Sequence, residues 1–166
     1  MAAEDGFFLA ILAFMGIFIV FMFLFAIVMY FFMAFGLYRM AENQNIELSW
    51  LAFIPIAQYY LLGVLVQSRL TGGMREGIPW ILVSLLAANF LLGIIAGVMP
   101  LIGFLALPIS LASVGFTIYA SFHLYKKYSE QYVVLFVFTI VTLGMLAPIF
   151  VFFIRNNMPL EEEAAA

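Results

Sequence analysis

The chain has 166 residues, of which 67% are hydrophobic and 9% are charged, and its formal net charge is −3. Soluble domains carry about 25% charged residues and nucleic-acid-binding surfaces need clustered positive charge, so the composition excludes both classes. The absence of cysteine excludes disulfides, thiolate metal sites and cysteine nucleophiles.

The first apolar run covers residues 6–38, which contain no charge and ten phenylalanines. It predicts a transmembrane helix over about 7–38, because a helix of this run would be roughly 50 Å long against a hydrocarbon core of roughly 30 Å. The acidic flank of Glu4 and Asp5 is unlike the basic start of a signal peptide, so we expect the mature protein to keep this helix. Within one subunit, we expect Phe18, Phe21 and Phe25 to be largely uncovered on at least one side.

The second apolar run, residues 48–68, is long enough to cross but is interrupted by Pro55. Basic residues in short loops prefer the cytoplasmic side of a membrane. If 48–68 enters and returns, five of the six basic residues lie together on that side: Arg39, Arg69, Arg75, Lys126 and Lys127. We therefore predict a re-entrant or interfacial helical segment here, in a multi-pass membrane protein with its N-terminus outside.

This run contains a motif, Trp-x-Ala-x-Ile-Pro-Ile-x-x-x-Tyr-x-Leu-Gly, which begins at Trp50 and ends at Gly63. It resembles a motif that follows the first helix of uncharacterised small multi-pass bacterial membrane proteins. The C-terminal stretch Phe152–Pro159 is similar to the end of the same proteins. The resemblance implies a multi-pass protein of the bacterial inner membrane and transfers no catalytic residue to this chain.

Pro55 determines the expected shape of the motif. It has no amide hydrogen, so the carbonyl near Leu51 needs another donor, for which Gln58 or a tyrosine hydroxyl is available. Trp50, Tyr59 and Tyr60 are expected to anchor the segment at headgroup depth. We interpret the motif as a bent structural helix in preference to a broken helix that faces a substrate.

The two remaining charge-free runs complete the predicted bundle. Residues 77–125 predict spans over about 79–99 and 105–125, separated by Pro100 and Gly103. Residues 131–154 predict a span over about 132–154, kinked near Gly144 and Pro148. In an alternative that the sequence leaves open, this last segment folds back at Gly144–Pro148.

The predicted fold is thus an all-α polytopic membrane helical bundle of four transmembrane helices plus the re-entrant or interfacial segment 48–68. We expect residues 1–159 to form a single transmembrane helical domain and residues 160–166 to form an exposed acidic tail.

Polar and small residues mark one candidate contact between spans. Asn89 is the most polar residue deep in any predicted span, and Gly93-x-x-x-Gly97 follows it. The next span carries hydroxyl residues at helical spacing: Ser110, Ser113, Thr117 and Ser121. Such stripes usually mean close helix packing and interhelical hydrogen bonds. The single histidine, His123, is expected to be hydrogen-bonded at the interface, because one histidine cannot make a multi-histidine metal site.

The function predicted from these patterns is not enzymatic. Ion-coupled transport usually requires an acidic or basic residue within the membrane, and no predicted span contains one. A hydrolase with a serine–histidine–acid set is also not expected, because acidic residues lie only at the edges of spans. We expect no cofactor and no metal, and an integral membrane protein that acts through helix–helix association. Its partners would be lipids and other membrane subunits or copies of itself. The alternative is a small uncoupled channel or carrier whose pathway is lined by Asn89, Ser110, Ser113 and Thr117.

Overall fold

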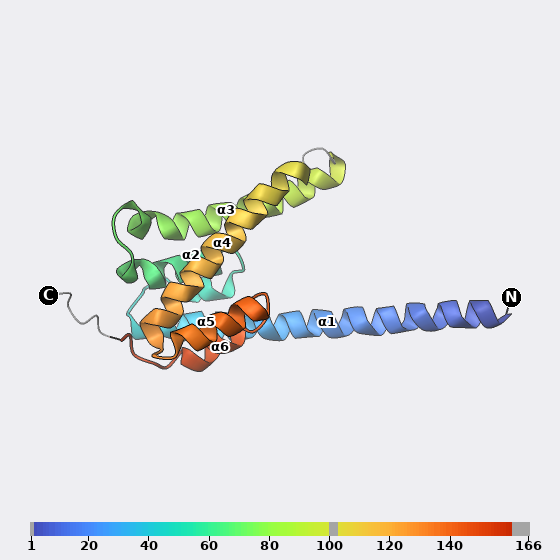
Figure 1. Ribbon diagram of the computed structural model, residues 1–166, viewed down its shortest axis with the longest axis horizontal. Helices are drawn as coiled ribbons and strands as arrows, with labels where there is room; N and C mark the ends of the chain where they lie inside the picture. The colour runs from blue at the N-terminus through green and yellow to red at the C-terminus, as the bar shows by residue number, and fades with distance from the viewer. Residues whose placement is uncertain (1, 100–102, 161–166) are drawn as a thin grey trace.

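The computed structural model describes residues 2–99 and 103–160 (Figure 1). Its elements, in chain order, are α1 (Ala2–Asn43), η1 (Ser49–Phe53), α2 (Ala57–Val66), η2 (Gln67–Arg69), α3 (Gly73–Val98), α4 (Gly103–Tyr128), α5 (Tyr132–Val141) and α6 (Ala147–Ile154). No strand occurs in these two ranges, so the all-α prediction is confirmed. The predicted tail beyond Leu160 and the predicted turn at Pro100 lie outside the described residues.

Three helices, α1, α3 and α4, are long and apolar enough to cross a membrane. They coincide with three of the predicted spans, although each extends beyond its expected bounds. α1 continues to Asn43 because its last turns are polar and hydrogen-bonded along the helix, with Arg39 pairing with Glu42 at 3.0 Å. α3 begins six residues before Pro79, whose missing amide hydrogen removes only one hydrogen bond near the helix start.

The expected single crossing over 132–154 is absent, and the count of four spans is not confirmed. The segment forms α5 and α6, of 10 and 8 residues, whose lengths of about 15 and 12 Å are each too short for a bilayer. Its two ends lie together, because Asn157 Nδ2 donates to the Tyr128 carbonyl at 2.8 Å and the Leu160 amide donates to the Lys127 carbonyl at 2.8 Å. The segment therefore folds back, as in the alternative reading.

The fold-back is produced by the turn between α5 and α6. The Leu143 amide donates to the Ile140 carbonyl at 3.0 Å and the Gly144 amide to the Thr139 carbonyl at 2.7 Å. This is the paired pattern of a Schellman motif, which ends a helix with a left-handed residue. Leu143 takes that conformation, with φ of 51°, and Gly144 follows with φ of 84°. Pro148, in the first turn of α6, suits the start of the returning helix.

Segment 48–68 also returns to the point where it begins. Lys127 Nζ donates both to the Gln44 side chain, just after α1, and to the carbonyl of Leu65, near the end of α2. α2 packs on α3, whereas α6 packs on α1. The two short helical hairpins, η1–α2 and α5–α6, thus begin and end at the same end of the bundle.

That shared end contains the core. α1 and α4 end there and α3 begins there, so all six basic residues lie near it, including Arg155, whose carbonyl accepts from Asn43 Nδ2. We call it the basic end. The fully buried side chains include Leu37, Leu61, Leu65 and Tyr125. At the opposite end, α1 continues past the rest of the molecule, and the α3–α4 hairpin diverges from it (Figure 1).

Candidate functional site

The predicted polar contact between α3 and α4 is present. Asn89 Nδ2 donates to Ser113 Oγ at 2.6 Å, and Ser110 Oγ donates to Asn89 Oδ1 at 2.6 Å. Nδ2 also donates to the Leu85 carbonyl at 2.9 Å, so both amide hydrogens have acceptors. Because these groups already satisfy one another, the contact can join two helices but has little capacity left to bind a solute.

The rest of the predicted stripe does not take part in this contact. Ser121 Oγ donates to the Thr117 carbonyl at 2.8 Å, one turn earlier on the same helix. Gly93 and Gly97 are exposed, and a Cβ placed on either would meet nothing within 4 Å. They are therefore not points of close helix approach within the chain.

Two other glycines are the points of close approach. A Cβ on Gly63 would lie 2.4 Å from Pro79 Cα, and a Cβ on Gly36 would lie 2.8 Å from Val151 Cγ1. They allow α2 to pack on α3 and α6 to pack on α1. Gly63 is the last residue of the motif, so the sequence marked it as a candidate. Nothing in the sequence distinguishes Gly36 from the other glycines.

The motif, residues 50–63, bends at the exposed residues 53–56 and ends in the core, and some of the contacts expected of it are wrong. The Leu51 carbonyl accepts from the Ile54 amide at 3.1 Å, because the segment before Pro55 is a 3₁₀ helix and needs no side-chain donor. Gln58 is only 6% exposed, and its Nε2 has no hydrogen-bond partner among the described residues.

The aromatic residues of the motif have different environments. Trp50 is exposed, and its anchoring at headgroup depth stays a prediction. Tyr60 instead packs its ring 5.2 Å from that of Trp80 on α3. Tyr59 packs against the core.

His123 is also placed differently from the expectation. Its ring makes edge contacts with Tyr119 and Phe122, at 4.5 and 5.5 Å between centroids. Its Nδ1 is buried and has no hydrogen-bond partner within the described residues. In residues 2–99 and 103–160, no three carboxylate or histidine side chains gather as a metal site would require.

A second polar cluster surrounds Lys127, at the basic end. Its side chain is 5% exposed, and Nζ donates to the Leu65 carbonyl at 2.7 Å and to Gln44 Oε1 at 3.1 Å. Gln44 Nε2 in turn donates to the Tyr128 hydroxyl. We call Gln44, Leu65, Lys127, Tyr128 and Asn157 the junction, because they join α1, α2, α4 and the chain that follows α6.

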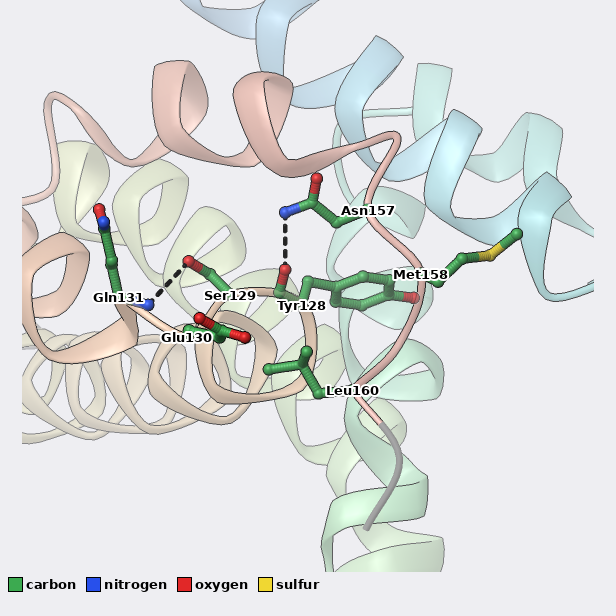
Figure 2. A pocket seen from close by; sticks show the side chains of 7 residues that line it. All are labelled: Tyr128, Ser129, Glu130, Gln131, Asn157, Met158 and Leu160. Carbon is green, nitrogen blue, oxygen red and sulfur yellow. Dashed lines mark hydrogen bonds between the residues drawn. The ribbon is translucent and has the colours of Figure 1, made fainter.

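An open hollow of about 430 Å³ lies beside the junction. It is lined by Tyr128, Ser129, Glu130, Gln131, Asn157, Met158 and Leu160, and Figure 2 shows Asn157 reaching across it to the Tyr128 carbonyl. Glu130 supplies the only charge among these lining residues. The hollow is thus the polar surface where the end of α4 meets the chain that follows α6.

Sequence reasoning missed the junction. The sequence analysis counted Lys127 only as a basic residue of a short loop and did not single out Gln44. One acceptor of Lys127 is the Leu65 backbone carbonyl, which has no signature in a sequence.

Substitution of Ser113 tests the role of the α3–α4 contact. Ser113→Ala should lower stability by about 0.6 kcal/mol or less, the average for hydrogen bonds between membrane helices. Ser113→Leu should lower it by roughly 1–3 kcal/mol, because the larger side chain has to separate the helices. Unfolding by a denaturing detergent measures both variants, and liposome flux measured on the same proteins provides the control. A stable Ser113→Leu protein with abolished solute flux would show a pathway instead.

Comparison with known proteins returns no match: no protein-family profile fits the chain, and neither a curated protein nor a solved structure matches it significantly. The resemblance of residues 50–63 to small multi-pass bacterial proteins stays a prediction.

Proposed function

We propose that this chain is a non-enzymatic integral membrane protein that acts through helix–helix association, as an assembly or accessory subunit or as a homo-oligomer. The observation that carries the proposal is the uncovered N-terminal part of α1. Phe18 and Phe21 are 50% and 60% exposed, and Phe25 is partly buried, so the chain fully covers none of the three.

The length of α1 makes lipid alone a poor cover for it. Its charge-free part is roughly 50 Å long, and a tilt of 40°, at the limit of what membrane helices show, shortens this to about 38 Å. The hydrocarbon core is roughly 30 Å thick. A second apolar helix beside α1 would cover the excess length, which favours association with another membrane protein or a second copy.

The satisfied polar contact supports association over a transport pathway. Asn89 already has partners on both helices for its amide hydrogens and its carbonyl oxygen. A solute would first have to displace these hydrogen bonds before it could enter a pathway lined by Asn89, Ser110, Ser113 and Thr117. The contact therefore fits packing between α3 and α4.

The orientation that we propose places the basic end in the cytoplasm of a bacterial cell, with the N-terminus outside. The support is the gathering of all six basic residues at the end where α1 and α4 finish. Positive charge in short loops is favoured on the cytoplasmic side.

Paired alanine substitutions on α1 test the association. The wild-type protein, purified in a mild detergent, should contain more than one chain or a stoichiometric partner when its mass is measured by light scattering. The double variant Phe18→Ala and Phe21→Ala should shift the mass toward a single chain without lowering the unfolding temperature, since both rings are largely exposed and Phe18 stacks on Phe14, one turn away on the same helix. Phe153→Ala, at a more exposed phenylalanine on α6, is the matched control and should leave the mass unchanged. A wild-type particle of one chain without a partner would refute the proposal.

A further inference from the structure

Both short helical hairpins are confined to one half of the molecule. η1–α2 and α5–α6 begin and end at the junction, and each turns back after a short outward limb. In Figure 1 both lie beside the C-terminal half of α1, whereas its N-terminal half has no neighbour. The half that contains the basic end is therefore the wider one.

Contacts with α1 fix how far each hairpin reaches. Tyr30 donates its hydroxyl to the Phe53 carbonyl, at the end of η1. On the other side, α6 runs in the same direction as α1, with Val151 against Gly36 and the Arg155 carbonyl bonded to Asn43. Tyr30 precedes Tyr38, the last residue of the charge-free run, by about 12 Å of helix. Both hairpins thus end near the middle of a hydrocarbon core roughly 30 Å thick.

The tip of the α5–α6 hairpin is built for an apolar surrounding. Leu143, at the tip, is 93% exposed and occupies the left-handed position where glycine is usual. Around it, the amides of Thr142, Leu143, Gly144 and Met145 all donate to carbonyls of the same hairpin. Thr142 Oγ1 donates to the Phe138 carbonyl at 2.7 Å, which satisfies the threonine hydroxyl as well. A non-helical turn is tolerated at membrane depth only when its polar groups have such partners.

We propose that the protein is a one-sided membrane wedge, whose two hairpins occupy the hydrocarbon of the leaflet at the basic end and stop near the midplane. That leaflet holds the three long helices together with η1, α2, α5 and α6, while the other leaflet holds α1, α3 and α4 alone. The surface on which this shape fits best is a bilayer that is convex on the side of the basic end. The partner of the hairpins is thus lipid hydrocarbon in a curved membrane.

The position of the α5–α6 hairpin is tested with single cysteines, for which the cysteine-free chain is a clean background. Glu130→Cys and Met158→Cys, before and after the hairpin, should react with an impermeant maleimide in the same population of sided host vesicles. Gly6→Cys should react in the oppositely sided population. A nitroxide on Leu143→Cys should be relaxed by oxygen and protected from a water-soluble nickel complex. Labelling of residues 130 and 158 from opposite sides, or exposure of residue 143 to nickel, would overturn the wedge.

The curvature preference is tested with full-length fluorescent protein in giant vesicles from which thin tethers are pulled. With the basic end outward, the tether-to-vesicle ratio of the protein should exceed that of a lipid dye, and with the basic end inward it should fall below it. Leu143→Asp, which withdraws the tip from hydrocarbon, should bring the ratio closer to that of the dye. Leu143→Gly keeps the turn, because glycine favours this backbone, and should retain the enrichment even if the aspartate variant misfolds. Ratios equal to the dye in both orientations would refute the proposal.

Discussion

Gly63→Ala should destabilise the protein by roughly 1–3 kcal/mol, the usual range for overpacking a well-packed contact. In a helix, replacing glycine by alanine ordinarily stabilises by about 1 kcal/mol, so the sign is decided by the surroundings of the new methyl group. Here it would lie 2.4 Å from Cα and 2.8 Å from the nitrogen of Pro79, which are backbone atoms that cannot rotate away. The steric effect therefore prevails, and α2 has to move away from α3.

Gly93→Ala is the matched control, because Gly93 also lies in a helix but has open space around it. It should leave stability unchanged or raise it slightly. Unfolding of both variants in a mixed-micelle titration, monitored by circular dichroism, measures the difference. Equal stability of the two alanine variants would mean that α2 does not lie against Pro79.

The three long helices were predictable because their apolar runs exceed anything a soluble core could cover. Their ends were predicted less well, since a helix can continue past the apolar run when its polar side chains bond along it. The hydrogen bond from the Tyr38 hydroxyl to Glu42 at 2.7 Å is one such case, four residues apart on α1. The first charged residue after an apolar run marks the expected boundary of the hydrocarbon core. The helix can continue beyond this residue.

The α5–α6 hairpin could not be predicted as firmly, because residues 131–154 have the composition of a transmembrane span. The distinction depends on the left-handed pair Leu143 and Gly144 and on bonds that Asn157 and Leu160 make with the end of α4. Such long-range bonds leave no periodic pattern. Gly144 and Pro148 indicated a break in the helix, but a kink and a reversal share these residues.

The sequence predicted the candidate polar contact between α3 and α4, in which one side chain forms a hydrogen bond with another side chain. Asn89 and the serines lie in otherwise apolar helices, where a polar group has to find a partner. The Leu51 carbonyl was assigned the wrong donor, because an amide in a tight 3₁₀ turn reaches it before any side chain does. Lys127 was missed for a related reason, as one of its acceptors is a backbone carbonyl far away in sequence.

Lys127→Met should lower stability by about 1.5–3 kcal/mol for each hydrogen bond from the charged amine that has no replacement. Methionine keeps most of the buried stem but cannot donate, so the Leu65 carbonyl and Gln44 Oε1 both lose a partner. An opposing effect exists, because no carboxylate pairs with Lys127 among the described residues, and removing an uncompensated buried charge relieves its desolvation. The loss should prevail, since the carbonyl of Leu65, a fully buried residue, is left without the amine.

Hydrogen exchange distinguishes this local effect from general unfolding. In Lys127→Met, amides near the end of α2 and after α1 should exchange faster, because the amine is the group that holds both to α4. Amides around Asn89 in α3 should keep their protection, as that contact does not depend on the junction. Lys126→Met, the exposed neighbour on the same helix, removes an equal charge and should change neither stability nor exchange. If Lys127→Met is more stable than the wild type, relief of desolvation outweighs the hydrogen bonds, and the junction is held by its apolar contacts alone.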